Sequence, residues 1–484
     1  MKAIITTLCF FLLATACTDV IERVPQGDYT LENFFQTEEQ AVQSVNAVYN
    51  QLRQWDTHVF SFIGMTDIVS DDADKGSIAS DGFFLQEIDQ FTYTPTNVGP
   101  NTVWSGYFRG VFRANLAIDG IPDVPEMDEE LRERLIGEAH FLRGYYYFNL
   151  VRWFGGVPLL LEPFPTDFQI PRSSADQIFD QVEADMQAAA DVLPDSYGGT
   201  DVGRITRGAA LGMLAKVALT RQDFQGAADH ALEVIDGGNY ALLDNYDAIF
   251  TPAGENSSES IFEIQAAAFE IGGGGSQYNE VQGVRGVPNL GWGFNKPSDD
   301  LIAAFERGDP RREATILYVG EILPDGSGIV EGDPGIVGER FNQKAYVGEH
   351  PGGNGNGPGN IRILRYADLL LVAAEALNEI GRPEEALTYL NRVRARARGT
   401  GNVLPDVTTT DQGELRRAIW QERRVELAME QHRWFDLVRT GRSFDVMKPL
   451  RPNFTADKNE LFPIPQTEID LSEGALEQNP GYGG

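Results

Sequence analysis

Two polar stretches of the sequence place aromatic rings beside amide and carboxylate groups. Ring faces stack on flat apolar groups, and planar amides and carboxylates hydrogen-bond hydroxyl groups in place of water. The stretches are NLGWGFNKPS and SDDADKGSIASDGFFLQEID, and the residues concerned are Trp292, Phe294, Asn295, Phe83, Phe84, Asp72 and Asp74. Because no regular element obliges these rings to be buried, they are candidates for binding a neutral ligand rich in hydroxyl groups. Tyr278 and Trp55 are further candidates; the alternative is that each ring packs its own loop onto the protein.

The acids of the second stretch raise the question of a metal ion. Asp71, Asp72 and Asp74 offer the oxygen ligands that calcium prefers, but their spacing is not that of an EF-hand loop. We therefore expect solvated acids here, with no metal site and no cofactor.

The short motifs of common catalytic sites are absent from the sequence. HExxH, CxxC, GxSxG and the phosphate-binding GxxxxGK do not occur, and neither glycine cluster forms a dinucleotide-binding GxGxxG turn. The five histidines are scattered: His58, His140, His230, His350 and His432. These observations favour a protein without catalytic activity. With 72 acidic residues some carboxylates always lie close together, so an α-helical glycoside hydrolase remains an alternative.

The chain is strongly acidic, with 72 Asp and Glu against 39 Lys and Arg and a net charge of −33. A field of this sign repels nucleic acid and anionic membrane surfaces. The basic run RVRARAR is therefore expected to pair with acids on adjacent helices. In QERRVELAMEQHRWFDLVR, the spacing of Glu and Arg predicts ion pairs within one helix.

The N-terminus reads as a secretory signal. MKAIITTLCFFLLATAC has a basic start, an apolar run and small residues before Cys17. Its end resembles a bacterial lipobox, although Ala14 stands where leucine is usual. We expect a signal peptide over residues 1–16, lipidation of Cys17 and a tether over 17–26; the alternative is an ordinary signal peptide.

Helical periodicity dominates the rest of the chain. It predicts helices over 37–55, 102–121, 128–154, 173–193, 206–222, 223–238, 364–381, 382–399 and 411–441. Two pairs, LAKVALTRQDFQGAADHALEVI and LLVAAEALNEIGRPEEALTYLNRV, resemble the helical hairpins of tetratricopeptide repeats. Between these sections the texture is glycine-rich with short strand-like runs such as SIFEIQ and ATILYVG.

The stretch EAHFLRGYYYFNLVRWFGGVPLL concentrates seven rings in one of the predicted helices. Its apolar residues cover most of the helix circumference, which is typical of a buried helix. We therefore interpret these rings as core and not as a stacking surface.

The aromatic helix and its exit turn closely resemble the SusD/RagB family of bacterial surface lipoproteins. Six later segments continue the resemblance in the family's order, from IPRSSADQIFDQVEADMQAAADVLP to AIWQERRVELAMEQHRWFDLVRTG. The resemblance implies one domain over 27–484. In it, a mostly α, degenerate tetratricopeptide-like scaffold (about 27–240 and 360–445) carries an irregular ligand-binding lobe (about 241–359) and a loop-rich tail (446–484).

The resemblance also implies a function. Such proteins sit on the outer face of the outer membrane and act as a lid over a SusC-like TonB-dependent transporter. They hold oligosaccharides, or in RagB-like members peptides, before import. The family's binding residues vary between members, so none is transferred to this sequence, and the ring-bearing loops remain the expected site.

Overall fold

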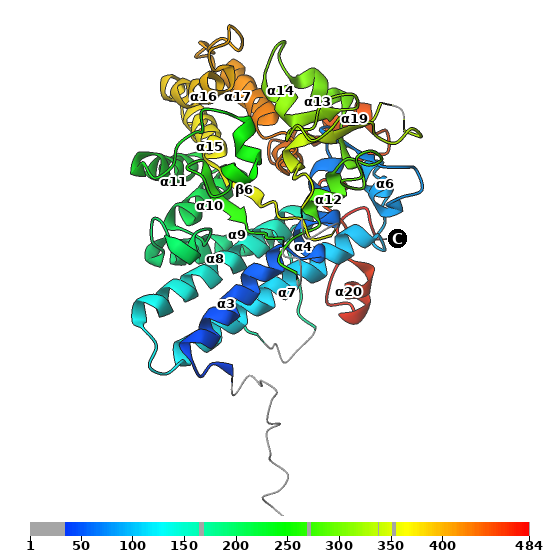
Figure 1. Ribbon diagram of the computed structural model, residues 1–484. Coiled ribbons are helices and arrows are strands. Elements are labelled where there is room, and N and C mark those ends of the chain that lie inside the picture. Colours follow the sequence, from blue (N-terminus) through cyan, green and yellow to red (C-terminus); the bar gives the residue numbers. More distant parts are fainter. Residues whose placement is uncertain (1–33, 164–168, 269–272, 337, 351–354, 484) are drawn as a thin grey trace, which may run out of the picture.

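Helices form most of the structure. The computed structural model describes residues 34–163, 169–268, 273–336, 338–350 and 355–483. Figure 1 shows long helices stacked on one side of the molecule and short elements gathered on the other. The α-helices of these ranges are α3 (Glu38–Leu52), α4 (Trp55–His58), α5 (Phe60–Ile63), α6 (Phe83–Asp89), α7 (Val98–Gly120), α8 (Glu129–Phe154), α9 (Ala175–Val192), α10 (Arg207–Thr220), α11 (Phe224–Gly237), α12 (Tyr278–Gln282), α13 (Asp299–Ala304), α14 (Arg311–Thr315), α15 (Tyr366–Glu379), α16 (Pro383–Arg398), α17 (Gln412–Glu426), α18 (Arg433–Arg439), α19 (Ser443–Leu450) and α20 (Gln466–Leu471).

The strands of the described ranges are short and form antiparallel pairs. β1 pairs with β3, β2 with β6 and β4 with β5. The expected strands in SIFEIQ and ATILYVG are confirmed as β2 and β4. Since β1 and β6 lie outside the lobe in sequence, two of the three pairs fasten the lobe to the helical sections. The strands are β1 (Ala73–Gly76), β2 (Ser260–Ile264), β3 (Phe294–Pro297), β4 (Ile316–Tyr318), β5 (Arg340–Asn342) and β6 (Ile361–Arg365).

Polar side chains start the long helices where the sequence pattern places them. Thr37 caps α3 and Ser174 caps α9, each in a reciprocal capping box with a glutamine three residues later. Asp128 and Thr206 cap α8 and α10 through their side-chain oxygens. Each cap satisfies an amide that the first helical turn leaves without a partner, and the predicted starts of these four helices are confirmed within two residues. Helix α7 begins at Val98, four residues before its predicted start, and is capped by Asn97.

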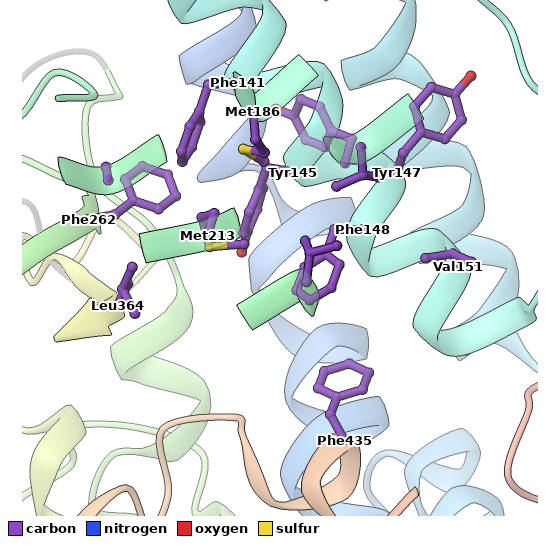
Figure 2. Close-up of a cluster of buried hydrophobic side chains, with 14 of the residues drawn as sticks. Phe141, Tyr145, Tyr147, Phe148, Val151, Met186, Met213, Phe262, Leu364 and Phe435 are labelled. Carbon is purple, nitrogen blue, oxygen red and sulfur yellow. The ribbon is translucent and has the colours of Figure 1, made fainter. Parts of the chain in front are cut away.

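Helix α8 is the centre of the hydrophobic core. Phe141, Tyr146 and Trp153 are completely buried, and Figure 2 shows the rings of this helix among side chains from other elements. The ring of Phe141 lies 5.1 Å from that of Phe262 on β2. Small residues permit this packing: a Cβ added at Gly110 of α7 lies 2.4 Å from the Tyr146 ring. The interpretation of this stretch as core is confirmed.

The two repeat-like pairs form helical hairpins. α10 packs against α11, α15 packs against α16, and α11 also packs against α15, so the hairpins stack on each other. This arrangement confirms the mostly α, tetratricopeptide-like fold class. One boundary differs: Leu364 and Arg365 belong to strand β6, and the helix begins at Tyr366.

The single helix expected over 411–441 is wrong. α17 ends at Glu426 and α18 begins at Arg433. Between them Met429 and Gln431 have φ values of 63° and 64°, which no α-helix accommodates. The amide and side chain of Gln431 donate to buried Asp67, and these bonds hold the chain in its non-helical course.

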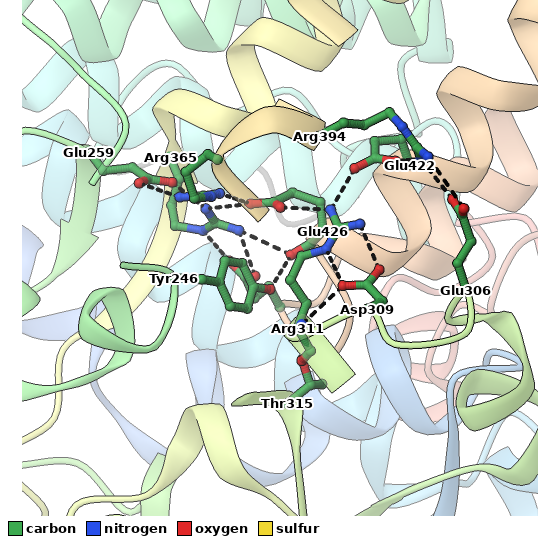
Figure 3. A network of polar contacts seen from close by, with 12 residues as sticks. Tyr246, Glu259, Glu306, Asp309, Arg311, Thr315, Arg365, Arg394, Glu422 and Glu426 are labelled. Carbon is green, nitrogen blue, oxygen red and sulfur yellow. Dashed lines mark hydrogen bonds and ion pairs between the residues drawn. The ribbon is translucent and has the colours of Figure 1, made fainter. Parts of the chain in front are cut away.

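Buried ion pairs join the lobe to α16 and α17 (Figure 3). Arg311 of α14 contacts Asp309 at 2.8 Å, Glu422 at 2.6 Å and Glu426 at 3.1 Å, and its side chain is fully buried. Arg365 contacts Glu259 at 2.7 Å and also pairs with Glu426. The lobe is thus attached through charges that are buried and mutually neutralised.

The outcomes for the charged runs are mixed. Arg394 and Arg396 pair with Glu422 and Glu426 of the adjacent helix, as expected. Within QERRVELAMEQHRWFDLVR, Asp436 pairs with Arg439 three residues later and with Arg423. The glutamates of this stretch pair with other elements instead, because their side chains point into the joint between the lobe and the helices. Glu430, for example, binds Lys344 and Arg365.

The C-terminal segment returns to the scaffold. It carries α20, and the amide of Phe462 donates to the carbonyl of Trp153 at 2.7 Å. The expected signal peptide (1–16), Cys17 and the tether (17–26) lie outside the described residues. Within the described ranges, no helix has the length and apolar character to cross a membrane.

Candidate ligand-binding site

The two ring-bearing stretches of the sequence lie side by side. Strand β1 follows Asp72 and strand β3 follows Trp292, and these strands pair in antiparallel register with Gly76 opposite Phe294. Gly76 has φ +71°, and a Cβ there would lie 2.3 Å from the carbonyl oxygen of Gly293. Glycine is therefore required for the close approach of the two segments.

Four rings surround the ring of Phe60. We call these five residues the ring cluster: Trp55, Phe60, Phe84, Trp292 and Phe294. The Phe60 centroid lies 5.2 Å from Trp55, 5.2 Å from Phe84, 5.9 Å from Trp292 and 4.8 Å from Phe294. Trp55 and Trp292 also contact each other directly, with centroids 6.0 Å apart and planes inclined by 58°. The structure thus brings together four of the ring candidates from positions more than 200 residues apart.

Exposure separates the rings that can meet a ligand from those that support them. Trp55 is 40% exposed and Phe83, next to Phe84 on α6, is 71% exposed. Trp292 and Phe84 are half-buried. These four side chains form the outer surface, whereas Phe60 lies beneath them.

The expectation of an exposed side chain is wrong for Phe294, Asn295, Tyr278 and Asp72. Phe294 and Asn295 are consecutive residues of strand β3, and both are buried, Asn295 completely. Since successive side chains of a strand point to opposite faces, β3 is covered on both faces. The hydroxyl of Tyr278 donates to Gln431. These residues support the site from within.

Asn295 connects the ring cluster to the scaffold. Its Nδ2 donates to Asp67 at 3.0 Å and to Gln282 at 2.8 Å. Burial raises the pKa of the Asp67 carboxyl to about 6, and the hydrogen bonds from Asn295 and Gln431 oppose that rise. The polar residue of the NLGWGFN stretch therefore fixes a loop and is not available to a ligand.

The acids at the start of the second stretch are ion-paired. Asp71 binds Arg433 at 2.7 Å and Arg424 at 2.9 Å, and Asp72 binds Arg424 at 2.8 Å. The expectation that these two acids are solvated is wrong, because α17 and α18 bring arginines onto them. Half-buried Asp74 pairs with Arg451 and Lys296. Among the described residues, no cluster of three or more acidic, His or Cys side chains is placed to hold a metal ion.

Polar groups border the exposed rings. Glu280 accepts the backbone amide of Trp292 at its carbonyl oxygen, and burial raises the pKa of its side chain, while hydrogen bonds from Gln277 and Trp292 oppose the rise. Asp56, next to Trp55, pairs with Arg109. On the other side, Arg285 pairs with Asp81 at 2.9 Å. Asp56 and Asp81 are thus held by arginines, whereas Oε2 of Glu280 has no hydrogen-bond partner among the described residues.

A large pocket lies beside the C-terminal end of α3, and no ring of the ring cluster lines it. Its volume is ≈ 480 Å³, and α3, Arg53 and the segments around Val202 and Gln265 line it. Arg53 stands two residues before Trp55 and donates to the carbonyl of Gly275 at 2.8 Å. The chain from Gly274, which lines the pocket, to Glu280, whose carbonyl accepts from the amide of Trp292, therefore connects the pocket to the ring cluster.

Sequence reasoning missed Phe60, the centre of the ring cluster. Phe60 stands in the apolar run HVFSFIGM, which carries no polar neighbours of the kind that marked the two loops. Phe60 could be recognised only from its ring contacts with Trp292 and Phe294, which come from a distant part of the sequence.

Comparison with known proteins agrees with this architecture, a tetratricopeptide-like scaffold with an inserted lobe. The model of the SusD family matches residues 258–482, and one described as "Starch-binding associating with outer membrane" matches residues 43–219. SusD-like protein P2 of Formosa agariphila is 28% identical over 99% of both chains.

Solved structures extend the likeness. A laminarin-binding SusD-like protein is 33% identical, with 93% of this chain and 100% of that chain covered and a TM-score of 0.78. Surface glycan-binding protein A from Bacteroides thetaiotaomicron, solved with laminarihexaose, is 26% identical, with 92% and 100% covered and a TM-score of 0.80. The chain belongs to the SusD family.

Proposed function

We propose that this protein is a non-catalytic surface glycan-binding protein and that the ring cluster, with Phe83, is its binding surface. The observation that carries the proposal is the contact between Trp55, which is 40% exposed, and half-buried Trp292, whose ring planes are inclined by 58°. Sugar rings stack their CH faces on such indoles. Two inclined faces suit successive units of a curved oligosaccharide.

Laminarin is the first glycan to test. The similarity to a laminarin-binding protein and to a protein solved with laminarihexaose supports this choice. The relatives are named as binding proteins, which also supports a role without catalysis.

We further propose the cellular setting. Lipidation at Cys17 anchors the chain to the outer membrane facing outward, and bound oligosaccharide passes to a partner TonB-dependent transporter of the SusC type. The family description that mentions the outer membrane supports this location. Loss of membrane anchoring in Cys17→Ala, measured by fractionation, is the expected result, and co-purification of a β-barrel transporter with the wild type tests the partner.

Affinity electrophoresis in laminarin tests the binding surface. We expect the wild type to be retarded and Trp292→Ala to lose affinity at least about tenfold, which is about 1.4 kcal/mol. Trp420→Ala is the matched control, since Trp420 is also half-buried but donates to Glu375 far from the ring cluster. Equal retardation of Trp292→Ala and the control contradicts the proposed surface.

Two alternative functions, peptide binding and glycoside hydrolysis, predict different results in the same assays. Binding of peptides but of no glycan in a panel of polysaccharides assigns the surface to peptides, as in RagB-like proteins. Release of reducing sugar from laminarin by the purified chain contradicts the non-catalytic proposal and indicates a glycoside hydrolase.

A further inference from the structure

A small cavity lies where α8, α10 and the α17–α18 connection meet. Its volume is ≈ 20 Å³, enough for one water-sized particle and too small for a sugar or a carboxylate. Aromatic side chains form much of its wall, and Figure 2 shows Tyr145, Met213, Phe148 and Phe435 of this wall. Its polar wall includes Arg152 and Lys216.

Arg152 is a half-buried cation that makes no ion pair with the described residues. Its guanidinium lies between two rings, 4.0 Å from the Phe148 centroid and 3.6 Å from that of Phe435. Nε donates to the carbonyl of Phe148 and Nη2 to Asn149, whereas Nη1 has no hydrogen-bond partner among the described residues. Burial lowers the pKa of Arg152 to about 10, so the group remains charged at neutral pH. The carboxylates of Asp436 and Asp368 oppose the fall in this pKa from a distance, but neither forms an ion pair with the guanidinium.

Lys216 brings a second cation to the same cavity. Its ammonium donates to Asp368 at 2.5 Å and to Nδ1 of His432 at 3.2 Å, which leaves one of its three N–H groups unassigned. Burial and the neighbouring Lys216 lower the pKa of His432 to about 3, so this imidazole is neutral and adds no charge.

The acceptors around the cavity already have donors. Both oxygens of Glu430 accept from Arg365, and one also accepts from Lys344. The Oδ1 of Asn149 accepts from Arg152. Guanidinium and ammonium groups can only donate. The charged groups with hydrogens left over, Arg152 and Lys216, are therefore both donors. A particle that only accepts matches both of them directly, whereas a water would also have to donate to an oxygen that already accepts, such as Glu430 Oε2.

We propose that this cavity is a binding site for a monatomic anion of the halide class, held by Arg152 Nη1 and Lys216 Nζ. The anion neutralises the unpaired guanidinium and joins α8 to α10 and to the connection before α18. This site is separate from the ring cluster, and its existence does not depend on the proposed glycan function.

Crystals of the wild-type protein grown in sodium bromide test the site directly. We expect an anomalous bromide peak in the cavity within hydrogen-bond distance of Arg152 Nη1 and Lys216 Nζ. Density without anomalous signal means that the cavity holds water only and overturns the proposal. This measurement requires no substitution.

Thermal and urea unfolding provide the second test. When the chloride concentration exceeds the dissociation constant of the site, each tenfold rise in that concentration is expected to lower the equilibrium constant of unfolding about tenfold. Sodium methanesulfonate at equal ionic strength is the reference salt. Arg152→Leu should abolish this dependence. Arg172→Leu should retain it, because Arg172 is a half-buried arginine that binds backbone carbonyls of Phe154 and Gly156 away from the cavity. Equal chloride dependence in Arg152→Leu and the wild type contradicts the proposal.

Discussion

In the helical scaffold the side chains between elements are rings and aliphatic groups, whereas the side chains that join the lobe to α16 and α17 are arginines and carboxylates. Trp153 illustrates the first region and Arg311 the second, and both are fully buried. Apolar burial is stabilising in itself and does not depend on a particular partner. A buried charge is tolerated only while its partners are present and ionised. The two regions should therefore respond differently to truncation and to acid.

The largest effect is expected from Trp153→Ala in the scaffold. The substitution leaves a cavity against Tyr107 and Phe435 and removes the hydrogen bond from Nε1 to the carbonyl of Met65. We expect a loss of about 3–5 kcal/mol in the free energy of unfolding, measured by urea denaturation. The loss should be the same at pH 7 and in mild acid. A strongly pH-dependent loss contradicts the view that this region is held by apolar packing.

A comparable or somewhat smaller effect is expected from Arg311→Leu at the lobe joint. Without the guanidinium, Asp309, Glu422 and Glu426 lose a shared partner while the site stays buried. Breaking a buried pair in this way costs about 3–5 kcal/mol at neutral pH. Unlike Trp153→Ala, this loss should shrink as the pH falls and the carboxylates can take up protons.

The neighbouring arginine provides the control for that substitution. Arg312 is 44% exposed and pairs with Glu313, which is 61% exposed. Exposed pairs contribute about 0–1 kcal/mol, so Arg312→Leu should change the urea midpoint little. Equal losses in the two variants contradict a special role for the buried joint.

Acid should weaken the lobe joint of the wild type before the scaffold. Burial alone raises the pKa of Glu426, but Arg396, Arg365 and Arg311 lower it to about 2, below its ordinary value of 4.5. A depressed carboxyl pKa contributes stability that is complete above 4.5 and is lost as the pH falls toward 2. Hydrogen exchange at about pH 3, corrected for intrinsic rates, should show β6 and α14 losing protection before α8. Simultaneous loss contradicts the comparison.

The same contrast explains which features could be predicted from the sequence. The rings of α8 follow helical spacing, and spacing within one segment is visible in a sequence, so the core was predicted correctly. The partners of Glu422 and Glu426 come from other elements, so the pairs predicted for them within the helix were wrong. The helix break at Gln431 depends on Asp67, which lies 364 residues away.

The candidate site could also be predicted only in part, because its contacts come from segments distant in the sequence. Glycine-rich texture and neighbouring polar groups identified Trp292 and Phe84 as members of one kind of loop, and the structure places both in the ring cluster. Asn295 is buried against Asp67 and Gln282, and its contact with Asp67, 228 residues away, is not visible in the local sequence. Which rings are exposed is therefore a tertiary property, even where the ring-bearing segment is recognisable.

The smallest effect on stability is expected from Phe83→Ala, because Phe83 belongs neither to the apolar core of the scaffold nor to the lobe joint. The Phe83 side chain is 71% exposed, so its removal should change the free energy of unfolding by no more than about 0.5 kcal/mol. If the proposed glycan surface extends over α6, laminarin affinity should nevertheless fall about threefold in isothermal titration, which is under 1 kcal/mol. Phe444→Ala is the matched control, because Phe444 is 44% exposed on α19 outside the ring cluster. An unchanged affinity in Phe83→Ala restricts the proposed surface to Trp55, Trp292 and Phe84, since exposure alone does not make a ring part of a binding site.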